Sequence, residues 1–194
     1  CPPHLEKQWE DDLFKFKIEA KIFTTGKIAN ALEEDTPGQK PIIIDEVHKF
    51  RNDETKDYLN LYQLCHNTNG NKANKIVLLS ATPFNNKPSD TFSLIKLFQI
   101  PTRSTLQTIT NLTVYFERVN KKYNSLKNEL IKKKRDKNQI FNDFNILGEE
   151  IRNIIAPLII RRSRIDLQNI KAYSEDLKKQ GIYFPKVNDP VLLE

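Results

Sequence analysis

Two short apolar runs, each followed by a polar motif, constrain the fold of this chain more than any other feature. The first run covers residues 42–44 and is followed by Asp45 and Glu46; the second covers residues 76–79 and leads into the sequence SATPFNN. Short uninterrupted apolar runs are typical of strands in parallel sheets, where helices cover both faces. We therefore predict two buried parallel strands whose ends present the polar motifs.

The segments around these runs alternate between helical and extended patterns. Asp53 is the expected N-cap of a helix between the runs, residues 5–17 and the segment after Ser89 have helical spacing, and residues 18–24 predict another strand. The apolar faces of these helices contain Tyr58, Leu61, Tyr62 and Cys65, then Leu5, Trp9, Leu13 and Phe16, then Thr91, Leu94, Ile95 and Phe98. Strands alternating with helices predict an α/β fold, and we expect Trp9 in its core.

From residue 111 to residue 155 the sequence becomes polar and helical. Its apolar residues recur at steps of three and four, as in packed helices; they are Leu112, Phe116, Val119, Tyr123, Leu126 and Leu130. We predict a projecting helical hairpin whose basic tip suits either DNA phosphates or plain solvation; the tip contains Lys121, Lys122, Lys127, Lys132, Lys133, Lys134 and Arg135. The expected parts are a sheet domain at 1–105, a helical insertion at 106–160, and a return segment and linker at 161–194.

The composition indicates a globular protein with a basic surface, since 38% of the 194 residues are hydrophobic, 29% are charged and the net charge is +6. This charge favours an anionic partner. No apolar run approaches the ~18 residues of a membrane span, and no signal-peptide pattern is present. Cys1 and Cys65 have neither Cys-x-x-Cys nor zinc spacing. We expect an intracellular protein, cytoplasmic or nucleoid-associated, with no membrane contact; the sequence leaves its oligomeric state open.

The acidic pair, Asp45 and Glu46, lies where the first strand should end, and open α/β sheets bind ligands at such ends. Adjacent carboxylates can divide the work of phosphoryl transfer: Asp45 would hold Mg²⁺ through water, and Glu46 would activate the attacking water. His48 could reach the hydroxyls of Ser80 and Thr82 if the strands pair. Either motif alone is more typical of a solvated strand end or an ordinary turn. The two together favour a nucleotide-hydrolysing site.

These motifs resemble those of superfamily-two helicase-like ATPases, and in detail those of the SWI/SNF-type subgroup. The matching residues are Pro2, Pro3, Leu5, Gln8 and Trp9 in motif one-a; Asp45, Glu46, His48, Arg51 and Asn52 in motif two; Ser80, Ala81, Thr82, Pro83 and Asn86 in motif three; and Ile160, Arg161, Arg162 and Asp166 after the insertion. Val47 replaces the usual Ala of the DEAH box, and Arg164 replaces a usual Lys. The resemblance covers nearly the whole chain.

The resemblance implies a RecA-like parallel sheet with a helical insertion, ATP and Mg²⁺ as cofactors, and movement along duplex DNA without strand separation. It implies that Asp45 holds Mg²⁺, that Glu46 activates water, and that His48, Ser80 and Thr82 couple hydrolysis to movement. The candidate DNA contacts are His4, Lys7, Thr24, Thr25, Lys132, Lys133, Lys134, Arg161 and Arg162. The two arginines suit a structural brace as well. Two alternatives stay open: a non-catalytic DNA- or protein-binding module, and the motor of a restriction or defence nuclease.

The phosphate-binding loop of such ATPases is not recognisable in this sequence. The TTGK sequence at residues 24–27 fails the G-x-x-x-x-G-K-[ST] pattern, because Lys21 stands where the first Gly should be. We expect the loop and its strand upstream of this chain, and a second RecA-like domain downstream. The predicted sheet is therefore incomplete, and we expect this stretch alone to bind nucleotide poorly and to be inactive.

Overall fold

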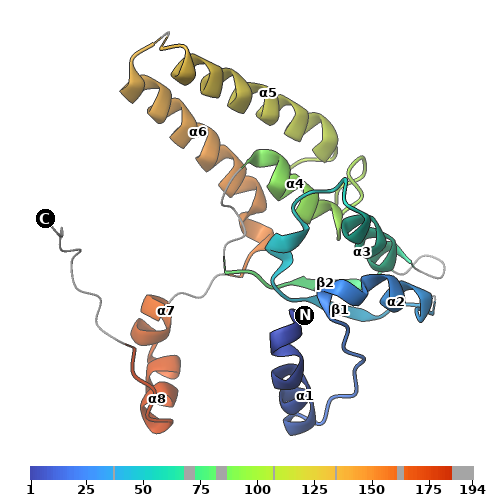
Figure 1. Ribbon diagram of the computed structural model, residues 1–194. Coiled ribbons are helices and arrows are strands. Elements are labelled where there is room, and N and C mark those ends of the chain that lie inside the picture. Colours follow the sequence, from blue (N-terminus) through green and yellow to red (C-terminus); the bar gives the residue numbers. More distant parts are fainter. Residues whose placement is uncertain are drawn as a thin grey trace, which may run out of the picture. The chain divides into compact units, whose positions relative to one another are not determined.

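The computed structural model describes residues 1–36, 38–67, 73–81, 87–106, 108–133, 135–160 and 164–184. The chain divides into two compact units, Cys1–Ile154 and Ile155–Glu194. The first unit contains a small parallel sheet with helices packed against it and a long helical hairpin (Figure 1). This arrangement is compatible with the predicted α/β class. Within the described ranges, no helix is both long and apolar enough to cross a membrane.

The sheet confirms that the two apolar runs pair with each other. β1 (Pro41–Ile44) and β2 (Lys75–Leu78) are parallel neighbours, with Ile44 opposite Leu78. The prediction that both faces are covered is wrong, since the exposed fraction of Ile43 is 53%. Alternate side chains of a strand point to opposite faces. In the described part of the chain, the apolar core therefore covers only the face that carries Ile44.

The core lies between this face and the surrounding helices, which are α2 (Ile28–Glu33), η3 (Val47–Phe50), α3 (Lys56–His66) and α4 (Pro88–Lys96). Its buried members are Ile28, Ile44, Val47, Phe50, Tyr58, Leu61, Cys65, Leu94 and Leu97. Since α3 lies between β1 and β2 in the chain, the three elements form a β-α-β unit. η3 follows β1 directly, so the residues after the acidic pair are anchored in the core.

Two helices begin at residues other than those predicted. The N-cap of α3 is Thr55 rather than Asp53, because the Tyr58 N–H donates to Thr55 Oγ1 at 3.3 Å. α4 begins at Pro88, one residue before Ser89, after which the sequence predicted a helix. Proline suits the first turn of a helix, where its missing N–H has no partner to lose.

The first elements of the chain are η1 (Pro3–Leu5) and α1 (Glu6–Lys15). Helix α1 is confirmed, but its apolar face is not buried as predicted. Trp9 is only half-buried, and Phe16 is 67% exposed. Phe16 follows the last turn of the helix, and the chain then turns away through Lys17, whose φ is 54°. The helix therefore contributes little apolar area to the core.

Residues 18–24 do not form the predicted strand. They run irregularly into η2 (Thr25–Lys27), and the Thr25 N–H donates to the Cys1 carbonyl at 2.9 Å. An alternating sequence becomes a strand only when it finds a partner edge. In the described sheet, β1 and β2 pair only with each other.

The predicted hairpin is confirmed as α5 (Leu112–Ile131) followed by α6 (Lys137–Ile155) (Figure 1). The buried residues of the predicted seam are Leu112, Phe116, Val119 and Leu126. Farther along, the rings of Tyr123 and Phe144 meet edge to face with centroids 5.6 Å apart. The Asp136 carboxylate accepts the Asn138 N–H at 2.9 Å and so caps α6.

The second unit contains helices in the range predicted as a return segment and linker. Its elements are η4 (Ala156–Leu158), α7 (Arg164–Asn169) and α8 (Lys171–Lys179). α8 is followed by Gly181, whose φ of 68° is left-handed, and the Ile182 N–H donates to the Leu177 carbonyl at 2.9 Å. This is the Schellman ending that favours glycine.

Candidate functional site

The candidate site lies at the ends of β1 and β2, where the acidic pair meets the loop that follows β2. The Leu79 N–H donates to the Ile44 carbonyl at 2.8 Å, and the Val47 N–H donates to the Leu79 carbonyl at 3.0 Å. These two bonds continue the parallel ladder beyond both strands. They hold the turn of Asp45 and Glu46 beside that loop, as the sequence predicted.

Asp45 is held by donors on both carboxylate oxygens. Its Oδ2 accepts the indole N–H of Trp9 at 3.0 Å, and its Oδ1 accepts the Glu46 N–H at 2.9 Å. The contact from Trp9 was missed, because the sequence analysis placed that residue in the core. An available signal was that a partly buried indole usually finds an acceptor for its N–H.

Glu46 has a left-handed backbone, with φ 50° and ψ 43°. For a residue with a side chain this conformation costs about 1–3 kcal/mol and is concentrated at functional sites. Its Oε2 lies 2.8 Å from His48 Nδ1, yet among the described residues no well-aligned hydrogen bond reaches this buried oxygen. The contact is therefore electrostatic, and it is an ion pair only with the protonated form of the imidazole.

His48 also reaches the loop after β2. Its Nδ1 lies 3.4 Å from Ser80 Oγ, which is a long hydrogen bond. The structure thus brings together four of the five residues predicted for catalysis and coupling. The fifth, Thr82, lies outside the described residues. So do two other residues of motif three, Pro83 and Asn86.

The oxygen ligands at this candidate site fit magnesium. Within the described residues, no group of three or more His, Cys, Asp or Glu side chains could hold a metal ion by itself. Mg²⁺ does not need such a group, because it keeps several waters and binds through one or two carboxylates plus substrate phosphates. From the described residues, each oxygen of Asp45 accepts one hydrogen bond. Lone pairs therefore remain for the waters of a bound ion.

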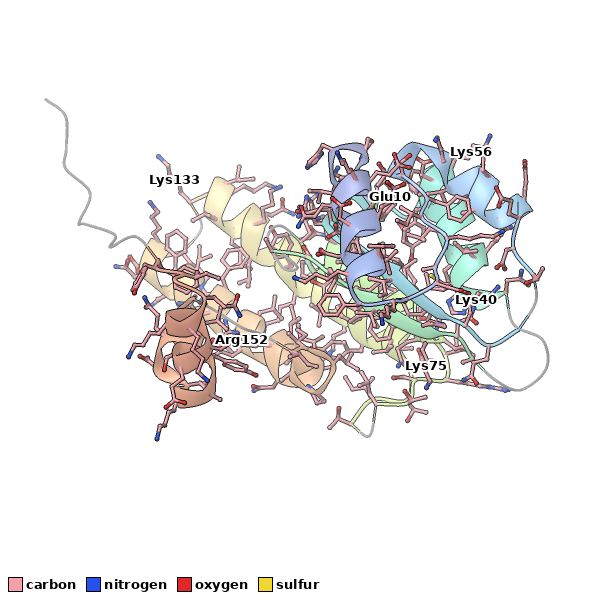
Figure 2. All side chains as sticks on the ribbon, turned by 90° about the horizontal axis from the view of Figure 1, so that it is seen from below. Glu10, Lys40, Lys56, Lys75, Lys133 and Arg152 are labelled. Atoms are coloured by element: carbon pink, nitrogen blue, oxygen red, sulfur yellow. The ribbon has the colours of Figure 1, made fainter. Side chains whose placement is uncertain are left out.

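The predicted DNA contacts lie in separate places. His4 and Lys7 are exposed near the start of the chain, whereas Thr24 is 7% exposed and Thr25 is half-buried. The exposed residues Lys132 and Lys133 lie at the tip of the hairpin, and Figure 2 labels Lys133 there. The remaining predicted contacts, Lys134, Arg161 and Arg162, lie outside the described residues.

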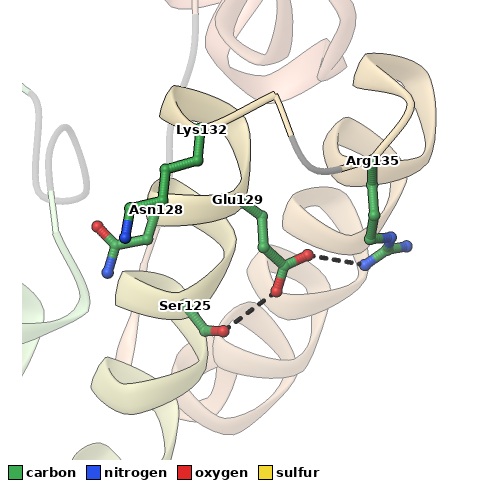
Figure 3. Close-up of a pocket in the computed structure, with 5 residues that line it drawn as sticks. All are labelled: Ser125, Asn128, Glu129, Lys132 and Arg135. Atoms are coloured by element: carbon green, nitrogen blue, oxygen red, sulfur yellow. Dashed lines mark hydrogen bonds and ion pairs between the residues drawn. The ribbon is translucent and has the colours of Figure 1, made fainter.

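A pocket of about 530 Å³ lies beside this tip, and Figure 3 shows its lining residues. They are Ser125, Asn128, Glu129, Lys132 and Arg135. Arg135 is 3.0 Å from Asp143 and 3.2 Å from Glu129, and both carboxylates raise the pKa of its guanidinium. Arg135 therefore links the two helices of the hairpin, and Lys132 and Lys133 are exposed lysines at the tip.

Comparison with known proteins identifies the family. A model of the SNF2-related domain matches residues 22–180, which is well over half of the chain. The chain therefore belongs to the SNF2-related domain family. Membership places it in a class of helicase-like ATPases and confirms the resemblance predicted from the motifs. No curated protein and no solved structure matches the chain.

Proposed function

We propose that this chain is part of a DNA-dependent ATPase that couples ATP hydrolysis to movement along duplex DNA, with β1 and β2 in a RecA-like sheet. The observation that carries the proposal is the parallel register, which brings Asp45 and Glu46 beside the loop containing Ser80. Membership of the SNF2-related domain family supports ATP hydrolysis. The net charge of +6 supports an anionic partner.

In this proposal the acidic pair divides the chemistry. Asp45 holds the waters of Mg²⁺, and the bound ion offsets the negative charge of the ATP phosphates. Glu46 orients the attacking water and accepts its proton. Its Oε2 already lies 2.8 Å from His48 Nδ1, so a protonated His48 would compete with the water for this oxygen.

The coupling is proposed to run through His48. Its Nδ1 faces both Glu46 Oε2 and Ser80 Oγ, at 2.8 Å and 3.4 Å. A side chain with two alternative partners is a two-state element of the kind that can link a nucleotide site to a distant surface. We propose that Ser80 and Thr82, in the loop after β2, couple the state of the site to movement on DNA.

The proposed DNA contacts are those predicted from the sequence. Lys132 and Lys133 combine positive charge with exposure at the tip of the hairpin. Such lysines contact phosphates without reading sequence. His4, Lys7, Thr24 and Thr25 are proposed contacts in the first part of the chain, and Lys134, Arg161 and Arg162 complete the proposed set.

The test is phosphate release by the full-length protein, measured with and without duplex DNA. The proposal expects Mg²⁺-dependent hydrolysis of ATP that duplex DNA stimulates. Asp45→Asn should raise the Mg²⁺ concentration needed for half-maximal rate, because it removes one charge from the ligand. Binding of duplex DNA without any hydrolysis of ATP would instead favour a non-catalytic DNA-binding module.

A further inference from the structure

Trp9 is the one tryptophan of the chain. Its indole N–H donates to Asp45, the candidate magnesium carboxylate. We infer that Trp9 is a positioning residue that fixes the Asp45 carboxylate in the orientation needed to hold hydrated Mg²⁺. The inference rests on the proposed function, since it assigns a role to a second residue of the same site. It adds a link between α1 and the end of β1.

The geometry of the contact suits positioning. The indole Nε1 lies 3.0 Å from Asp45 Oδ2, across 36 positions of sequence. The indole N–H can only donate, and its ring is rigid, so it fixes one oxygen without competing as a metal ligand. The Glu46 N–H fixes the other oxygen at 2.9 Å. The two donors together define the plane of the carboxylate and leave a lone pair on each oxygen for metal-bound water.

Packing alone does not account for Trp9. None of the residues of α1 is buried, and Phe14 on the same helix is 86% exposed. Partial burial favours contact of the indole with the protein but does not fix the orientation of its N–H, because the hydrophobic effect is non-directional. The hydrogen bond from Trp9 is charge-assisted, and such bonds are about twice as strong as neutral ones. The bond to Asp45 therefore determines how the indole is placed.

The contact can be measured directly by NMR of the indole N–H in the ¹⁵N-labelled full-length protein, with the Trp9 signal assigned through Trp9→Phe. Asp45→Ala should shift this signal and speed its exchange with water, because its acceptor is lost. Asp57→Ala, which changes an exposed carboxylate of α3, should leave it unchanged. Adding MgCl₂ should shift the signal in the wild-type protein but not in Asp45→Ala.

The consequence for the site is a shift in Mg²⁺ dependence. Trp9→Phe keeps the ring and removes the donor, so the Mg²⁺ concentration for half-maximal ATP hydrolysis should rise about tenfold, which is a typical loss for a hydrogen bond to a charged group. The maximal rate at saturating Mg²⁺ should fall much less. Phe14→Leu, the matched change of an exposed aromatic on α1, should leave both quantities unchanged.

Two results would overturn the inference. One is an indole signal that does not respond to Asp45→Ala or, in the wild-type protein, to MgCl₂. The other is a Trp9→Phe protein that loses thermal stability or maximal rate while its Mg²⁺ half-point stays at the wild-type value, which is the signature of a structural role. The indole measurements need no turnover. Absence of ATP hydrolysis in the wild-type protein would therefore reject the proposed function, and the MgCl₂ titration would still decide for or against the role of Trp9.

Discussion

At the residue scale, His48 connects the acidic pair to the loop after β2. Its Nδ1 lies between Glu46 Oε2 and Ser80 Oγ, with the carboxylate the nearer at 2.8 Å. One ring nitrogen cannot make a good hydrogen bond to both groups at once. The choice between the two partners is therefore set by small changes in the site, as the proposed coupling requires.

Loss of His48 or Ser80 should weaken the stimulation by DNA more than the hydrolysis of ATP itself. We expect His48→Ala and Ser80→Ala each to lower the DNA-stimulated rate of ATP hydrolysis about tenfold more than the DNA-free rate, a typical coupling energy. The double variant should resemble the single ones, because residues of one network are non-additive. Steady-state rates with and without duplex DNA measure this. Additive losses, or full DNA stimulation in both single variants, would contradict it.

Cys65 gives a pH dependence of stability. Burial raises its pKa from 9.0 to about 12. Between these values the unfolded chain releases the thiol proton while the folded chain keeps it. Stability is therefore fully present below pH 9 and falls as the pH rises, by up to about 1.4 kcal/mol per unit from this group.

Urea unfolding from pH 8 to pH 11 tests this expectation, with Cys65→Ala as the comparison. The variant should be less stable at pH 8 because of the small cavity it leaves. Its stability should fall less steeply above pH 9, since the ionising group is gone. Equal slopes for the two proteins would show that Cys65 does not titrate as its burial demands.

At the element scale, the hairpin of α5 and α6 should bind DNA phosphates through the lysines at its tip. Each phosphate contact contributes about 0.9 to the slope of log affinity against log salt concentration. Changing Lys132 and Lys133 to Gln should therefore lower the slope for duplex DNA by about two units. Lys56 and Lys75 are exposed lysines of α3 and β2 (Figure 2). Changing this control pair to Gln should leave the slope unchanged. Equal effects of the two pairs on the slope would show that the hairpin lysines do not contact DNA.

The elements also show which patterns were informative. The seam from Leu112 to Leu126 predicted a helix that forms, because its spacing is sustained over several turns. The alternation in residues 18–24 was too short to be decisive, and the strand it predicted found no partner in the described sheet. Helices α7 and α8 were missed, although Gly181 carried the ending signal of α8.

At the scale of the whole molecule, the sequence could predict the part of the site that depends on the pairing of the two strands. Parallel strands present their ends at one edge of a sheet, so two motifs after two strands had to meet once β1 paired with β2. The contact between Trp9 and Asp45 depends on where α1 docks. Docking is set by tertiary contacts that no local pattern encodes. The left-handed backbone of Glu46 was equally hidden, because Glu is not a residue that favours it.

The central claim is that the acidic pair belongs to the ATP-hydrolysing site of an ATPase. One pair of variants in the full-length protein tests it most directly. Glu46→Gln should bind ATP with nearly wild-type affinity while its rate of phosphate release falls at least about a hundredfold, since the group that accepts the water's proton is lost. Glu54→Gln changes an exposed carboxylate a few residues away and should keep the wild-type rate. Normal phosphate release by Glu46→Gln would contradict the account.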